Sequence, residues 1–130
     1  MDQRHLDADV LAGLLAESRT LADEAAAAEK CSVEWEPLWR IEPIPFDSGL
    51  IADARRACQA VSGTDHALPS GPLHDAAEMA RHVPTVMLFS SSTNGISHAK
   101  EEDTPIEHLE LAIRAYAQTV GAAIARVAAG

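Results

Sequence analysis

The sequence has few aromatic residues, few cysteines and few basic residues. Aromatic side chains make up 4% of its 130 residues, whereas hydrophobic residues make up 47%, and many of these are alanines. A composition rich in alanine favours helices. Ten lysines and arginines stand against 20 aspartates and glutamates, which gives a formal net charge of −10. Because an acidic chain repels phosphate groups, this charge argues against nucleic acids and anionic membranes as partners.

Disulfide frameworks and targeting segments are also missing. The two cysteines, Cys31 and Cys58, form neither a C-x-x-C pair nor the dense pattern of a secreted disulfide protein. No run approaches the roughly 18 apolar residues of a membrane-spanning helix. The N-terminus lacks the basic region and apolar core of a signal peptide. These features predict reduced thiols and a cytoplasmic location.

Three helices are predicted before residue 82. Asp7 is a suitable N-cap for a helix over residues 8–29, and Leu6 and Leu11 are placed to form a hydrophobic staple. Asp47 is a suitable N-cap for a helix to about residue 62, and Gly63 follows as its C-terminal glycine. A short helix is predicted over residues 75–81.

The most regular helical pattern lies in the last quarter of the chain. The residues T-P-I-E at 104–107 combine an N-cap threonine, a proline at the first helical position and a glutamate at the third. Apolar residues then recur at helical spacing to the end of the chain. They are Ile106, Leu109, Ile113, Tyr116, Val120, Ile124 and Val127. This stripe predicts a helix that packs along one face.

Three other segments have the patterns of strands. Residues 31–39 alternate apolar and acidic side chains, which indicates a half-exposed strand, and residues 66–68 are a short candidate. Residues 85–89 are apolar without alternation, as in a strand that is covered on both faces of an α/β sheet. Two prolines in I-E-P-I-P-F-D predict a domain boundary after residue 42. The predicted fold class is α/β, with helices packed on a small sheet.

The loop that follows residues 85–89 ends in G-I-S-H, which places His98 at a candidate site. Loops at the carboxyl ends of strands carry ligand chemistry in open α/β sheets, and an imidazole can bind a divalent metal. The alternative is a surface histidine with local hydrogen bonds. The sequence has no H-x-x-x-H motif. The acidic run at 101–103 is more simply interpreted as a solvated approach to the last helix.

Two further polar clusters are candidate binding sites. A guanidinium such as that of Arg4 can grip a carboxylate through two hydrogen bonds, although a surface salt bridge is the alternative. The residues S-G-P-L-H-D at 70–75 lead into a predicted helix, where backbone N–H groups can bind anions. Histidine and aspartate are also ordinary residues at helix starts, so both interpretations remain open.

Taken in order, the motifs D-x-R-H, P-x-P-F-D, S-G-x-x-H-D-A, P-T-x-M-x-F and N-G-I-S-H resemble one family. It is that of the N-carbamoyl-L-amino-acid hydrolases and allantoate amidohydrolases, a branch of the zinc-aminopeptidase-like metallohydrolases. The resemblance covers essentially the whole chain but only the C-terminal third of such an enzyme. It implies that residues 1–42 end a lid and dimerisation domain. Residues 43–130 would form the C-terminal part of the α/β catalytic domain.

The resemblance also implies roles for particular residues. His98 matches a metal ligand, Arg4 matches the residue that holds the substrate carboxylate, and Ser70, Gly71 and His74 match the loop that lines the substrate pocket. In the complete enzymes, two divalent metal ions, zinc or manganese, serve the hydrolysis of a carbamoyl or ureido C–N bond. The other metal ligands and the general base belong to an N-terminal part that is absent from this sequence.

This sequence departs from the family pattern at two places. Pro72 and Leu73 replace a small Ala-Gly pair in the pocket loop, and Ala99 and Lys100 replace Asn-Pro after the histidine. We expect the chain alone to be inactive and to need a complementary N-terminal-half chain or a second copy in a homodimer. The substrate would be a small N-carbamoyl or ureido compound. The alternative is a non-catalytic dimerisation or interaction module with the same fold.

Overall fold

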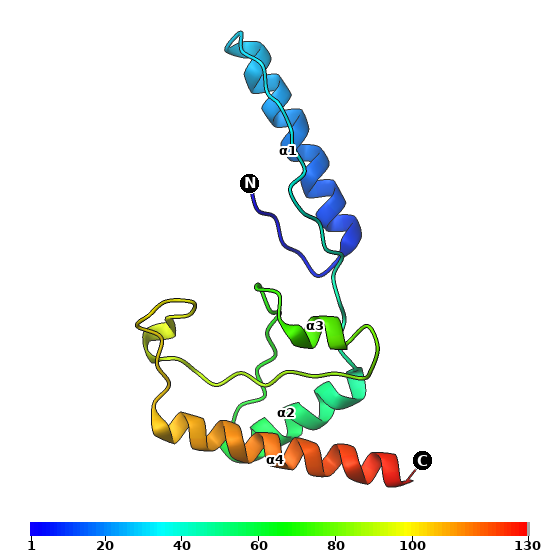
Figure 1. The fold of residues 1–130 in the computed structure, drawn as a ribbon, viewed down its shortest axis with the longest axis vertical. Helices are drawn as coiled ribbons and strands as arrows, with labels where there is room; N and C mark the ends of the chain where they lie inside the picture. The colour runs from blue at the N-terminus through cyan, green and yellow to red at the C-terminus, as the bar shows by residue number, and fades with distance from the viewer. Residues whose placement is uncertain (130) are drawn as a thin grey trace. The chain divides into compact units, whose positions relative to one another are not determined.

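The structure is a computed structural model that describes residues 1–129, and within them all regular structure is helical (Figure 1). The chain divides into two compact units, Met1–Ile44 and the described residues from Pro45 onward. The elements are α1 (Ala8–Ala28), α2 (Ser48–Ser62), α3 (Asp75–Met79), the 3-10 turn η1 (Thr93–Gly95) and α4 (Ile106–Ala129).

The predicted sheet is absent from the described residues, so the α/β class is not supported and this was an error of the sequence analysis. Residues 31–39, 66–68 and 85–89 follow no regular secondary structure. A strand requires a neighbouring segment that accepts its backbone hydrogen bonds. Within the described chain, one backbone–backbone bond involves residues 85–89, from the Asp47 N–H to the Thr85 carbonyl at 3.0 Å. The local pattern suits a strand, but no partner segment is present.

In the first unit, α1 begins as predicted at Asp7. The Asp7 carboxylate accepts hydrogen bonds from the N–H groups of Asp9 at 2.8 Å and Val10 at 3.1 Å. The Arg19 guanidinium lies over the Trp35 ring, 5.6 Å from its centroid, so the chain that follows α1 returns along it (Figure 1). The returning segment buries little of α1, since Ala26 is the buried residue of this helix.

In the second unit, α2 packs against α4 and both predicted ends of α2 are confirmed (Figure 1). The Asp47 carboxylate accepts a hydrogen bond from the Leu50 N–H at 2.7 Å, and Gly63 adopts the left-handed conformation with φ 77°. The side chains buried between the helices are small. They are Ala54 and Ala57 from α2 and Ala115 and Thr119 from α4.

An ion pair with a buried carboxylate joins the last turn of α4 to the first turns of α2. Asp53 is 4% exposed and contacts the guanidinium groups of Arg126 and Arg56. Arg126 also donates a hydrogen bond to the Gly49 carbonyl at 2.7 Å. A Cβ atom at Gly49 would collide with the Arg126 guanidinium, so this close approach depends on the glycine. Neither Asp53 nor Arg126 stood out in the sequence.

The α4 stripe, Ile106 to Val127 as defined above, has the predicted helical period but is not packed against the described chain. Tyr116 is 62% exposed and Ile124 is 65% exposed. Helix geometry places this stripe about a third of a turn away from Ala115 and Thr119, which face α2. The first helical bond also begins one residue later than predicted, since the Pro105 carbonyl accepts it from the Leu109 N–H at 3.0 Å. None of the helices in residues 1–129 is long and apolar enough for a membrane crossing.

The N-cap of α1 should titrate below the ordinary Asp range. Hydrogen bonds from the Val10 and Asp9 N–H groups lower the pKa of Asp7 from its ordinary value of 3.8. The stabilisation is therefore present above pH 3.8 and is lost as the pH falls through the lower folded-state value. We expect the amide NMR shifts of Asp9 and Val10 to titrate with a midpoint below 3.8. In an Asp7→Asn variant, which keeps a good cap, this titration should vanish while α1 remains helical.

Removing Arg126 or Asp53 should lower the free energy of unfolding by different amounts. Arg126→Ala leaves the buried Asp53 carboxylate with Arg56 alone, and we expect a loss of about 2 kcal/mol, discounted because Arg126 is 44% exposed. Asp53→Ala should cost less, because the released arginine can reach water. The exposed Arg114→Ala is the control and should change stability by under about 0.5 kcal/mol. Urea denaturation measures all three, and equal losses for Arg114 and Arg126 would contradict the assignment.

Candidate functional site

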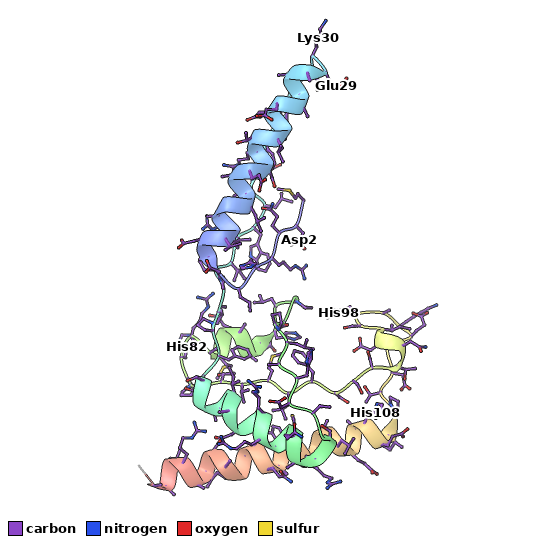
Figure 2. The ribbon with its side chains drawn as sticks, turned by 180° about the vertical axis from the view of Figure 1, so that it is seen from behind. Asp2, Glu29, Lys30, His82, His98 and His108 are labelled. Carbon is purple, nitrogen blue, oxygen red and sulfur yellow. The ribbon has the colours of Figure 1, made fainter. Side chains whose placement is uncertain are left out.

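His98 lies on the exposed loop between η1 and α4 (Figure 2). Its backbone has φ 58°, an uncommon conformation for a residue other than glycine. Its N–H group donates a hydrogen bond to the Glu102 carboxylate at 2.7 Å. The acidic run at 101–103, interpreted from sequence as merely solvated, therefore holds the backbone of the candidate ligand.

The ends of this loop are tied to each other. The Ser91 hydroxyl and the His108 Nδ1 atom share a hydrogen bond of 2.8 Å, although 17 positions separate them. The Thr93 N–H donates to the Asp103 carbonyl at 2.8 Å. These two bonds close the segment that carries His98, which we call the His98 loop (residues 91–108). Its neck is the Ser91–His108 bond.

The predicted pocket residues Ser70, Gly71 and His74 lie together before α3. The Ser70 hydroxyl donates to the Pro72 carbonyl at 2.9 Å, which leaves the serine engaged within its own turn. His74 occupies the N-cap position of α3 without a capping bond from its side chain. Its ring meets the edge of Phe89 at 6.1 Å between centroids. This contact brings the pocket loop next to the segment that leads into the His98 loop.

Arg4 lies in the first unit and already holds a carboxylate. Its Nε and Nη2 atoms donate to both carboxylate oxygens of Asp2, at 2.5 to 3.2 Å. This hydrogen bonding raises the pKa of Arg4 and lowers the pKa of Asp2. The pairing is the surface salt bridge that the sequence left open as an alternative.

The described residues do not by themselves fit a divalent metal. No group of three or more histidine, cysteine, aspartate or glutamate side chains between residues 1 and 129 is placed to hold one. A catalytic zinc site commonly needs about three protein ligands. His98 therefore has no such set of ligands beside it among residues 1–129.

Two open hollows beside α2 in the second unit are lined by none of the predicted site residues. One is lined by Ala52, Arg55, Arg56, Gln59, Ala60 and Asp65 on and beside α2. Arg55 is paired with Asp65 at 2.5 Å, and the hydrogen bond from Arg55 lowers the pKa of Asp65. Arg56 of this hollow contacts Asp53, so both arginines that line it are already paired.

The sequence analysis missed Ser91, His108 and the role of Glu102. No local pattern marks a serine and a histidine that are 17 positions apart as partners. The contact arises because α4 starts beside the end of the extended segment. The Glu102 contact has a local signal, since a carboxylate four residues after a loop residue can accept its N–H.

Comparison with known proteins finds one family model and several curated relatives. The model of peptidase family M20/M25/M40 matches residues 1–122. Allantoate amidohydrolase of Escherichia coli (strain K12) is 33% identical over 119 residues, which are 90% of this chain and 28% of that protein. N-carbamoyl-L-amino-acid amidohydrolase of Rhizobium meliloti is 33% identical over 73 residues, or 56% of this chain and 17% of that protein.

A third relative gives the same picture. N-carbamoyl-L-amino acid amidohydrolase of Geobacillus stearothermophilus is 28% identical over 102 residues, or 78% of this chain and 25% of that protein. The chain thus spans less than a third of the length of these curated relatives. No solved structure gave a significant match. The resemblance drawn from the motifs is confirmed, and the chain belongs to peptidase family M20/M25/M40.

Proposed function

We propose that this chain supplies the C-terminal part of a metal-dependent amidohydrolase that cleaves C–N bonds of N-carbamoyl amino acids or ureido compounds. The observation that carries the proposal is the match of 119 residues to an allantoate amidohydrolase, supported by two N-carbamoyl-L-amino-acid amidohydrolases. Residues 1–42 would end a lid and dimerisation domain, and residues 43–130 would end the catalytic domain. The two free cysteines support a cytoplasmic location.

Within this function, His98 would be one metal ligand, for zinc or manganese, with its imidazole presented from an exposed loop. Arg4 would exchange Asp2 for the carboxylate of the substrate, since the two carboxylates offer the same pair of acceptors. Ser70, Gly71 and His74 would line the substrate pocket. Because the described residues do not fit a metal alone, the chain's own contribution is to bind and orient rather than to complete the reaction.

We further propose that activity requires the complementary N-terminal part of the hydrolase. The support is physical: the buried apolar side chains of the second unit are alanines, while the α4 stripe is exposed. Residues 86–89 also leave their backbone groups without backbone partners in the described chain. A polypeptide that paired with residues 86–89 and covered the stripe would satisfy both needs.

A homodimeric, non-catalytic module is the second candidate function. The same exposed stripe favours it, because two copies could cover each other's apolar surface. Light scattering on the purified chain separates the candidates. A stable dimer that gains no activity with any hydrolase N-terminal part would favour the module.

The chain alone should bind metal weakly. We expect Zn²⁺ or Mn²⁺ to bind no tighter than about micromolar in a calorimetric titration, because one imidazole cannot replace the roughly three ligands of a catalytic site. His98→Ala and the control His82→Ala, which removes another exposed histidine, should differ little. Tight, stoichiometric metal together with turnover of an N-carbamoyl amino acid by the chain alone would contradict the proposal.

Complementation should restore activity. We expect the chain, co-expressed with an allantoate amidohydrolase truncated before its matching segment, to hydrolyse allantoate or an N-carbamoyl-L-amino acid when Mn²⁺ or Zn²⁺ is added. His98→Ala should lower kcat/KM by at least about a hundredfold, as loss of a metal ligand requires. Arg4→Ala should act mainly by raising KM. The control His82→Ala should retain activity, and equal losses in both histidine variants would refute the role of His98.

A further inference from the structure

The His98 loop is closed by side chains that no motif assigns a role. At its neck, Ser91 ends the extended segment and His108 stands on the first turn of α4, with a hydrogen bond of 2.8 Å between them. This bond fastens both ends of the loop to α4, which itself packs on α2. Figure 2 shows His98 on this loop and His108 on the helix where the loop ends.

Within the loop, Glu102 fixes the backbone at His98 itself. Its carboxylate accepts the His98 N–H at 2.7 Å, and its own N–H donates to the Ala99 carbonyl at 3.0 Å. A histidine with φ 58° sits outside the favoured backbone regions and persists where the surroundings hold it. The direction of the Cα–Cβ bond of His98 therefore depends on Glu102.

We propose that His108 and Glu102 are positioning residues for His98: His108 closes the neck of the loop through Ser91, and Glu102 holds the His98 backbone in its left-handed conformation. This inference rests on the proposed function, in which His98 presents an imidazole to a metal. Neither residue touches the reacting atoms. Their contribution is to fix where and in which direction the imidazole is presented.

The neck bond has a property that suits this role. A serine hydroxyl can donate to a bare imidazole nitrogen or accept from a protonated one. The Ser91–His108 bond can therefore form with either tautomer of His108.

Amide hydrogen exchange and ¹⁵N relaxation on the full chain test the inference. Ser91→Ala and His108→Ala remove the neck bond, and Glu102→Ala removes the acceptor at His98. We expect the exchange of the His98 amide to accelerate by about threefold to tenfold in each variant, the range expected for loss of one net hydrogen bond. The heteronuclear NOE of residues 94–101 should fall, while the amides of α2 and of the α4 segment after Thr119 remain unchanged.

Conservative variants separate positioning from general structural damage. Ser91→Thr keeps the hydroxyl, His108→Asn keeps a polar atom near the Nδ1 position, and Glu102→Gln keeps an oxygen acceptor, so each should restore most of the protection of the His98 amide. Unchanged His98 exchange in both Ser91→Ala and His108→Ala would overturn the neck role, and unchanged exchange in Glu102→Ala would overturn that of Glu102. If these readouts behave as expected while His98→Ala keeps full activity in the complemented enzyme, the proposed function fails and the loop clamp stands.

Discussion

The second unit depends on one buried ion pair set into a contact of very small side chains. The α2 and α4 helices meet through Ala54, Ala57, Ala115 and Thr119, which bring the two backbones close but bury little apolar area. The contact between the Asp53 carboxylate and Arg126 adds a specific polar interaction to this interface of small side chains. Every feature of the candidate site that α4 supports, including His108 and the neck of the His98 loop, depends on this attachment.

Two parts of the second unit are left uncovered: the apolar surface of α4 and the backbone of residues 86–89. From Ala115 to Ala125, α4 carries no charged residue, although the chain as a whole has a net charge of −10. A helical segment of eleven residues without a charge offers an apolar surface that another segment can cover. Residues 86–89 make the same point through their backbone, since an extended apolar segment without hydrogen-bond partners fits the middle of a sheet. Both features agree with a chain that spans less than a third of its curated relatives.

Local signals in the sequence were sufficient for the helices but not for what they contact. The caps Asp47 and Asp7 and the terminal Gly63 were predicted, because each acts on backbone groups within a few residues. The period of α4 was correct, yet the face that packs on α2 is the alanine face and not the α4 stripe. The sheet failed for the same reason, since a strand is defined by a partner that no local pattern reveals.

In the candidate site, too, local features could be predicted and long-range contacts could not. A short motif predicted the loop that carries His98, and Ser70, Gly71 and His74 lie on the segment before α3, while their roles stay predictions. The contact of His108 with Ser91 could not be predicted, because it depends on where the first turn of α4 lies relative to the end of the extended segment.

The attachment of α4 to α2 has a mechanical consequence. The buried face of α4 begins at Ala115, and His108 stands seven residues before it, a lever of about 10 Å at the helical rise of 1.5 Å per residue. A tilt of about 5° of α4 on α2 would carry His108 by about 1 Å over that lever. The angle between the two helices is thus converted into the placement of the His98 loop, and a contact along α4 could adjust His98 without touching it.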